Sequence, residues 1–313
     1  MTDTLFRELR RLAAEFAPRG LPVIIGGGYG LLLRQRRVER LVERDGAGTL
    51  MDVPVERTTR DLDVFLTVEI LADAEKAEAI REVLETLEYV VVPGKESYQF
   101  VQEVDETDEF PRGVKIDLLA PVPRDMGKHP ALKLDRIRPD HKKIKNRDVG
   151  RLNAFATPEA FTIAEQTEIV SLDVEDVREG AVSGEPDGGA GLHAEIPHPF
   201  TYLILKLFAY RDRQDDESRD FRYHAYDLYR VVAMLTEADL TAVDEMRGRF
   251  GADPVVVEAS RIVAELFEDE DAKGAVAVQG YSQVVGSDLG TDDVSTFCAH
   301  LNDLLPLPAD SQG

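Results

Sequence analysis

Two stretches of the chain, residues 59–66 and 114–119, alternate apolar and charged positions as half-buried strands do. In the first stretch Asp61 and Asp63 share one face, and their apolar neighbours share the other. In the second stretch the apolar neighbours of Asp117 face a core, so this acid lies on the open side. The pattern therefore predicts two strands that each carry acids on one face. If the strands are neighbours, the three carboxylates converge.

Helical spacing of apolar residues predicts the remaining large elements, with Asp73 as a suitable N-cap for one of them. The predicted helices cover residues 5–16, 31–44, 73–89, 158–166, 200–210, 226–235, 239–250 and 254–267. Shorter apolar stretches predict further strands at 21–25, 89–92, 97–104 and 169–174, with 50–55 as either a strand or an insertion. The expected fold class is α/β (α+β), with a mixed β-sheet flanked by helices and a helical C-terminal domain.

The order of these elements suggests two domains joined by a connection. Residues 1–150 hold most of the predicted strands, and residues 197–313 are helical in pattern. Residues 151–196 contain a glycine-rich turn and weaker patterns, so we expect them to connect the domains.

Composition narrows the class of protein. The chain has 313 residues with 43% hydrophobic content, enough for two domains with real cores. No stretch is long and apolar enough to cross a bilayer, and the N-terminus lacks a signal-peptide pattern, so we expect a cytoplasmic protein with no membrane partner. A lone Cys298 excludes an internal disulfide and a cysteine-based metal cluster.

Charge is distributed unevenly. The net charge of −23 argues against broad attraction to nucleic acid. Residues 128–151 reverse this balance locally, with nine Lys or Arg against three acids. This stretch could receive a polyanion such as an RNA end or a triphosphate, or it could be a solvated loop that pairs with acids elsewhere.

The acidic strand and a glycine turn carry the candidate chemistry. Paired carboxylates repel one another, and a cation such as Mg²⁺ between them relieves the repulsion; the alternative is a solvated Asp-x-Asp. Gly26, Gly27 and Gly28 stand between a strand and a helix, where backbone N–H groups can approach a phosphate; the alternative is a simple tight turn. With Asp117, these features describe a metal-dependent phosphoryl or nucleotidyl transfer site.

The same features resemble a known superfamily. Gly27-Gly28-Tyr29 before a helix, the segment Thr59-Arg60-Asp61-Leu62-Asp63-Val64-Phe65, and Lys115-Ile116-Asp117 resemble the core of DNA-polymerase-β-like nucleotidyltransferases. Residues 198–213 and 223–229 are similar to the Lys-x-x-Ala-x-x-x-Arg and Tyr-Asp-Leu motifs of AbiEii-type nucleotidyltransferases, which include toxins of toxin–antitoxin and abortive-infection systems. The resemblance covers roughly residues 20 to 235.

The resemblance implies a Mg²⁺-dependent enzyme that moves NMP from an NTP to an acceptor hydroxyl, in some relatives at the 3′ end of tRNA. A toxin of this kind would have an antitoxin protein as a partner. The resemblance assigns roles to the matching residues of this chain. Gly27 and Gly28 would contact the phosphates, and Asp61, Asp63 and Asp117 would bind Mg²⁺ and act in catalysis. Lys206 would be catalytic and contact the nucleotide together with Arg213, with Asp227 beside them.

Several features depart from the family or allow other interpretations. More than thirty residues separate Gly28 from Asp61, which suggests an insertion at 36–56, and the serine of the usual Gly-Ser turn is missing. The acceptor could instead be a small molecule or a protein, or the fold could be a silent binding module.

Individual side chains also have structural interpretations. Lys206 could extend its ammonium to the surface. Arg213 could belong to a salt-bridged surface, and Asp227 could be an interhelical hydrogen-bond partner. The scattered His193, His198 and His224 favour structural roles over a metal site.

Overall fold

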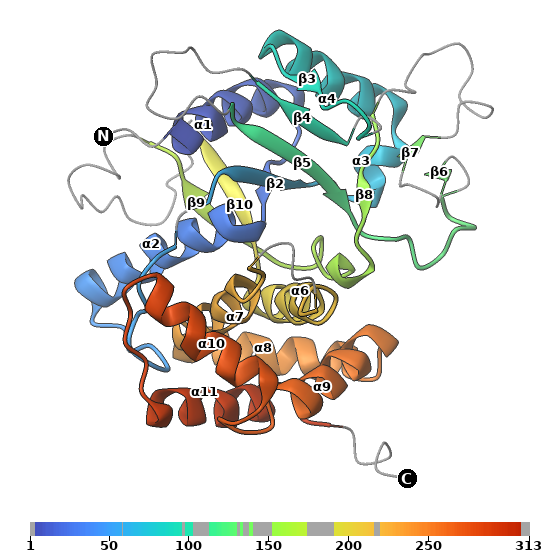
Figure 1. Cartoon of the computed structure of the whole chain (residues 1–313). Helices are drawn as coiled ribbons and strands as arrows, with labels where there is room; N and C mark the ends of the chain where they lie inside the picture. The colour runs from blue at the N-terminus through green and yellow to red at the C-terminus, as the bar shows by residue number, and fades with distance from the viewer. Residues whose placement is uncertain are drawn as a thin grey trace. The chain divides into compact units, whose positions relative to one another are not determined.

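The computed structural model describes residues 4–57, 59–95, 98–102, 113–129, 132–133, 138–139, 152–173, 191–215 and 220–307. The chain forms two compact units, drawn in Figure 1. The sheet unit consists of residues 1–34 and 58–197, and the helical unit consists of residues 35–57 and 198–313. Each unit is therefore built from two separate stretches of chain.

The sheet unit contains a mixed sheet, as its alternating segments predicted. Its strands lie in the order β3 (Val90–Val91), β4 (Gln99–Val101), β5 (Lys115–Ala120), β2 (Asp61–Phe65), β1 (Ile24–Ile25), β10 (His193–Pro197) and β9 (Thr167–Ser171), and β8 (Phe155–Ala156) also pairs with β5. The pairs β2–β5, β1–β10 and β5–β8 are parallel, and the other pairs of this sheet are antiparallel. The two acidic strands β2 and β5 are therefore direct neighbours.

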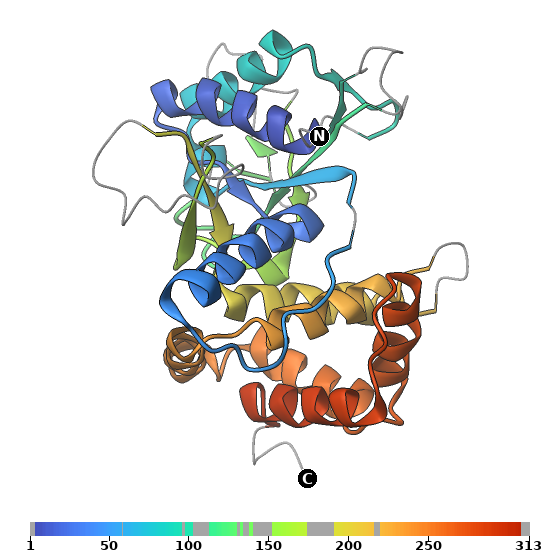
Figure 2. The same cartoon turned by 90° about the vertical axis from the view of Figure 1, so that its left-hand side faces the viewer.

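Helices cover the apolar face of this sheet. The helices of the unit are α1 (Thr4–Phe16), the start of α2 (Gly27–Asp45), α3 (Val68–Ala72) and α4 (Ala74–Thr86), with 3-10 turns at Ala17–Arg19 and Pro158–Ala160. Helices α1 and α4 pack on each other, and their apolar residues share one core with β2 and β5 (Figures 1 and 2). The Asp73 side chain caps α4 as predicted, because it accepts hydrogen bonds from the N–H groups of Glu75 and Lys76.

The helical unit contains α6 (Pro199–Arg211), α7 (Tyr223–Ala233), α8 (Glu237–Phe250), α9 (Pro254–Leu266), α10 (Lys273–Val284) and α11 (Thr291–Leu304). Helix α7 packs against α6, α10 and α11, and the apolar stripe predicted on α6 is buried. His198 caps α6, since its Nδ1 accepts a hydrogen bond from the Phe200 N–H at 3.2 Å. The structural role expected for this histidine is confirmed. Cys298 is a free, buried thiol of α11.

Three parts of the chain differ from the sequence-based prediction. Residues 151–196, expected as a connection, supply β8, β9 and β10 to the sheet, and β10 pairs directly with β1. The helix expected over 158–166 is limited to the 3-10 turn Pro158–Ala160. A small two-stranded sheet, β6 (Leu132–Lys133) and β7 (Arg138–Pro139), was not predicted.

The segment expected as an insertion belongs to the helical unit. The N–H groups of Leu50 and Met51 donate to the carbonyls of Leu235 and Ala233, at 2.8 and 3.1 Å. Near its end, the Val55 carbonyl accepts a hydrogen bond from the Tyr226 hydroxyl at 2.9 Å. The segment is therefore fixed to α7 and to the residues that follow this helix.

Among the described residues, every helix is too short or too polar to cross a lipid bilayer.

Candidate functional site

The alternation of β2 and β5 places three acids on one face of the sheet, as predicted. Asp63 on β2 is the direct neighbour of Asp117 on β5, and Asp61 is the direct neighbour of Lys115. The residues between them are completely buried, Leu62 and Ile116 at 0% exposure. Because side chains alternate along a strand, burying the apolar residues turns the acids to the opposite face. We call Asp61, Asp63 and Asp117 the acidic cluster.

Two neighbouring polar side chains organise the acidic cluster. The Lys115 Nζ lies 3.0 Å from an oxygen of Asp61 and 3.2 Å from an oxygen of Asp117. The Gln99 Nε2 on β4 donates to the other Asp117 oxygen at 2.7 Å. The side chains of Asp61, Lys115 and Asp117 are 45%, 30% and 20% exposed. The cluster is therefore preorganised and still reachable from solvent.

The charge of Lys115 is stabilised by its two acidic partners. Burial alone lowers the pKa of the Lys115 ammonium, but the carboxylates of Asp117 and Asp61 outweigh this effect and raise the pKa above its ordinary value. Lys115 therefore carries its positive charge at neutral pH.

The glycine segment contacts the acidic cluster directly. The Gly26 N–H donates to the Asp63 carbonyl at 2.8 Å, and α2 begins at the next residue. Gly27 has φ +58°, and a Cβ at this position would lie 1.6 Å from the Asp63 Oδ2. Only glycine fits here, because both the backbone conformation and the space exclude a side chain.

The structure corrects the expected position of these glycines. Gly27 and Gly28 form the first turn of α2 instead of a loop that precedes the helix. The first turn of α2 itself therefore lies against Asp63. A helix N-terminus favours negative charge, and here the carboxylate of Asp63 lies beside it.

The donor set of the acidic cluster suits a hard divalent cation, since carboxylates are the ligands that Mg²⁺ prefers. However, no group of three acidic, histidine or cysteine side chains among the described residues is arranged to hold a metal ion. Asp61 and Asp117 converge on the Lys115 ammonium instead. The acids expected as metal ligands thus share a face without forming a complete coordination site in this conformation.

A second charged cluster lies inside the helical unit, around Asp227 on α7. The Arg57 guanidinium donates to both Asp227 oxygens at 2.8 Å, and the Lys206 Nζ and Arg230 Nη1 lie 2.7 and 3.1 Å from the same carboxylate. Arg230 also donates to the Gln35 side chain at 2.8 Å. We call Arg57, Lys206, Asp227 and Arg230 the Asp227 cluster.

The Asp227 cluster is buried, and its charges depend on one another. Asp227 has 0% exposure, and Lys206 has 5%. Burial alone would raise the pKa of the Asp227 carboxyl, but Lys206, Arg57 and Arg230 hold it well below its usual range. Asp227 is therefore an interhelical partner, as one interpretation expected. The alternative in which the Lys206 ammonium extends to the surface is wrong.

A neutral histidine lies next to this cluster. Neither ring nitrogen of His224 has a hydrogen-bond partner within the described part of the chain. The ring stacks 6.1 Å from Phe221 and lies 4.2 Å from the ring of Tyr223. Burial, reinforced by the charge of Lys206, lowers the pKa of His224 to about 2. The imidazole therefore packs as an uncharged aromatic ring.

Arg213 lies on the exposed surface at the end of α6. Its Nη1 donates to the Ala209 carbonyl at 3.4 Å, and its guanidinium lies 5.9 Å from the Phe221 ring centroid. The structure thus brings the three acids and Gly27 together in the sheet unit. It places Lys206, Arg213 and Asp227 in the helical unit.

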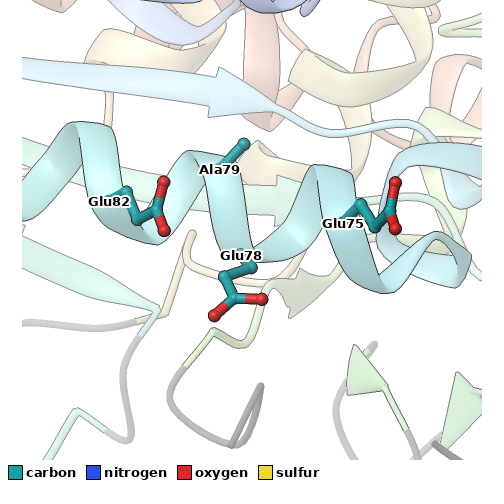
Figure 3. A pocket seen from close by; sticks show the side chains of 4 residues that line it. All are labelled: Glu75, Glu78, Ala79 and Glu82. Atoms are coloured by element: carbon teal, nitrogen blue, oxygen red, sulfur yellow. The ribbon is translucent and has the colours of Figure 1, made fainter. Parts of the chain in front are cut away.

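Another acidic surface lies on α4, outside both clusters. Glu75, Glu78, Ala79 and Glu82 line a shallow hollow on this helix, shown in Figure 3. Glu78 is 3.8 Å from the Arg81 guanidinium, so its charge is partly neutralised within the helix. These residues follow helical spacing on a solvent-facing surface, and we interpret them as a solvated helix face.

Sequence reasoning did not identify four of the polar residues that hold these clusters: Gln99, Lys115, Arg57 and Arg230. Lys115 lies two residues before Asp117 and so shares its face, but its pairing with Asp61 depends on the register between β2 and β5. Arg57 reaches Asp227 across 170 positions in the chain, which no local pattern reveals. Most of the basic stretch 128–151 lies outside the described residues, so its expected role stays a prediction.

Comparison of the chain with models of protein families, with curated proteins and with solved structures finds no match in any of the three.

Proposed function

We propose that the protein is a Mg²⁺-dependent nucleotidyltransferase that moves NMP from an NTP to an acceptor hydroxyl. The observation that carries the proposal is the side-by-side placement of Asp63 and Asp117 on neighbouring parallel strands. Asp61 shares their face, and the glycine start of α2 lies against Asp63. Clustered acids beside a helix N-terminus are the groups that metal-assisted phosphate chemistry requires.

The acidic cluster would supply the ligands for Mg²⁺. Asp61, Asp63 and Asp117 carry the carboxylate oxygens, and the Asp61 and Asp117 side chains are exposed enough to leave access for a solvated cation. When bound, the metal would neutralise the phosphates of the nucleotide and favour departure of pyrophosphate. Gly27 and Gly28 would offer backbone N–H groups to those phosphates.

The proposed transfer conserves atoms and charge. The oxygen of the acceptor hydroxyl forms a bond to the α-phosphorus, and the bond from this phosphorus to the bridging oxygen of the β-phosphate breaks. Pyrophosphate leaves with the bonding electrons, and the hydroxyl proton passes to a base. Asp117 is assigned this role because it lies beside Asp63 on the same face, and Gln99 and Lys115 fix its orientation.

For the helical unit, the proposed roles are based on the resemblance of its sequence motifs to those of nucleotidyltransferases. Lys206 is assigned to the triphosphate of the nucleotide and Arg213 to a supporting contact. In the helical unit the Lys206 side chain is 6% exposed and its ammonium lies 2.7 Å from Asp227, so contact with a triphosphate requires the ammonium to turn from this carboxylate toward solvent.

Two acceptor classes remain within the proposal. The resemblance to toxin-type enzymes favours the 3′ end of tRNA, in which case an antitoxin protein would be a partner. The net charge of −23 favours a cationic small molecule or a protein, because a polyanionic RNA would be repelled from most of the surface.

Calorimetry of the whole chain with each NTP, with and without Mg²⁺, tests the proposal. The expected result is nucleotide binding that requires the metal. Absence of metal-dependent binding would identify a silent module of this fold and reject the enzyme. Labelled NTPs incubated with total tRNA, cell protein or aminoglycosides then identify the acceptor by the product that carries the label.

A further inference from the structure

A cation of the protein itself already pairs with two of the three carboxylates of the acidic cluster. The Lys115 ammonium lies between Asp61 and Asp117, within 3.2 Å of a carboxylate oxygen of each. In a nucleotidyltransferase, these same carboxylates would be required by Mg²⁺. Lys115 and the metal would therefore compete for the same carboxylate oxygens.

The sheet fixes Lys115 in this position. Lys115 is the direct neighbour of Asp61 across the β2–β5 pair, and it precedes Asp117 by two residues on its own strand. All three residues consequently point to the same face of the sheet. The β4–β5 pair adds Gln99 opposite Asp117, which orients that carboxylate toward the ammonium. The contact follows from strand register and does not depend on a flexible loop.

We propose that Lys115 is an internal counter-ion that competes with Mg²⁺ for Asp61 and Asp117 and so determines how tightly the acidic cluster binds the metal. This inference rests on the proposed function. Formal charge supports it, because the Lys115 ammonium offsets one of the two negative charges of Asp61 and Asp117, and its removal leaves both charges uncompensated by this lysine. A divalent cation is attracted more strongly by the second arrangement.

The same contact accounts for the absence of a ready coordination site among the described residues. Asp61 and Asp117 turn toward the ammonium, and no third acidic, histidine or cysteine ligand joins them around a metal position. Metal binding would require Lys115 to release at least one of these carboxylates. Lys115 thereby keeps weakly bound divalent cations out of the cluster until a nucleotide adds its own phosphate ligands to the metal.

Titration calorimetry of the full chain with MgCl₂, and separately with MnCl₂, tests this inference without measuring catalysis. In Lys115→Met the Kd for each metal should fall at least tenfold relative to wild type. Lys115→Arg keeps the charge and should bind each metal like wild type, within about threefold.

Two further variants separate the local effect from other causes. Lys95→Met removes one positive charge from an exposed turn of the same unit, and its Kd should stay within twofold of wild type. Lys115→Gln is neutral but keeps a hydrogen-bond donor for the two aspartates. It provides the same test if the methionine variant fails to fold, as judged by circular dichroism.

The outcomes distinguish the inference from the function on which it rests. An unchanged or higher Kd in both neutral Lys115 variants would overturn the counter-ion role, because Lys115 would then be a spacer that helps to assemble the site. Failure of wild type and every variant to bind either metal, even with NTP present, would overturn the proposed nucleotidyltransferase itself.

Discussion

The two charged clusters use the same chemical groups in opposite proportions. Around Asp227, three cations surround one carboxylate that has 0% exposure. In the acidic cluster, Lys115 pairs with Asp61 and Asp117 while Asp63 lies beside Asp117, and the Asp61 side chain is 45% exposed. The first arrangement is closed to solvent, whereas the second keeps an excess of negative charge within reach of a dissolved cation.

The difference indicates what each cluster does. A buried ion pair stabilises its surroundings only while every partner is present, because a lone buried charge is costly. Partly exposed acids contribute little to folding, since water screens them. Removing one partner from the Asp227 cluster should therefore lower stability, whereas removing one from the acidic cluster should mainly change ligand binding. The following predictions test this division.

The largest effect is expected on activity. Asp63→Asn should lower Mg²⁺-dependent nucleotide transfer about 1000-fold, because the metal contributes several kcal/mol to the transition state and each 1.36 kcal/mol changes the rate tenfold. The fold should remain, since asparagine has nearly the same shape as aspartate and its side-chain oxygen still accepts hydrogen bonds. Label transfer from NTP measures the effect.

The matched control is Asp73→Asn, which removes one charge from the same unit and keeps a helix cap. Equal activity in the Asp63 and Asp73 variants would show that the acidic cluster has no special role.

The next effect is on stability. Asp227→Asn should lower the free energy of unfolding by about 3–5 kcal/mol, because it leaves the cations of Arg57, Lys206 and Arg230 without their shared buried carboxylate. Urea unfolding followed by circular dichroism measures the loss.

Asp212→Asn is the control for this variant, because Asp212 is paired with Arg211 at 2.7 Å on the surface of the same unit. Its cost should stay below about 1 kcal/mol. If the two substitutions cost the same, burial of the Asp227 cluster is not what stabilises the helical unit.

A smaller effect is expected at the glycine beside Asp63. Gly27→Ala should lower the free energy of unfolding by about 2–4 kcal/mol. The alanine would have to adopt the left-handed backbone conformation of Gly27, and its Cβ would clash with the Asp63 carboxylate. Gly46→Ala has a similar φ of +63° with nothing within 4 Å, so it should cost only about 1 kcal/mol. Urea unfolding measures the loss of stability in both variants, and the difference between the two losses is the cost of the clash. Equal losses would contradict the close approach of Asp63.

The smallest effect appears only at low pH. The pKa of His224 is lowered to about 2 in the folded chain, so between pH 6.5 and 2 the unfolded chain binds a proton that the folded chain does not. This contribution to stability is complete above pH 6.5 and decreases as the pH falls, by up to about 1.4 kcal/mol per pH unit.

His224→Phe should preserve the stacking on Phe221 and reduce this pH dependence, measured by urea unfolding at pH 7 and pH 5. The control is His193→Gln, which changes an exposed histidine of β10 and should unfold with the pH dependence of wild type. Equal slopes for wild type and the His224 variant would mean that this imidazole accepts a proton without unfolding.

Local patterns predicted the parts of the fold that depend on local chemistry. Strict alternation around Asp61 and Asp117 predicted both strands and the face that each acid occupies. The N-cap at Asp73 was also correct, because a cap requires only the next few residues. The mixed sheet with flanking helices and the helical C-terminal region follow from the same periodicities.

Features that depend on pairing between distant segments were not predicted. Strand β10 (His193–Pro197) ends in proline and lies close to a glycine-rich stretch, so its own sequence is a weak strand signal. Its position is stabilised by β1 on one side and β9 on the other. The Lys115 contact with Asp61 and the Arg57 contact with Asp227 likewise require a register or a tertiary contact that one sequence does not display.

The helical unit is made from two separate stretches of chain, and this limits how the gene can be divided to produce the unit alone. A fragment that starts at His198 would contain all six helices α6 to α11, yet it would lack the 35–57 segment. Its Asp227 would lose Arg57, and the carbonyls of Ala233 and Leu235 would lose their backbone donors. No single cut yields both halves intact, so isolating the helical half calls for a fusion that restores this segment.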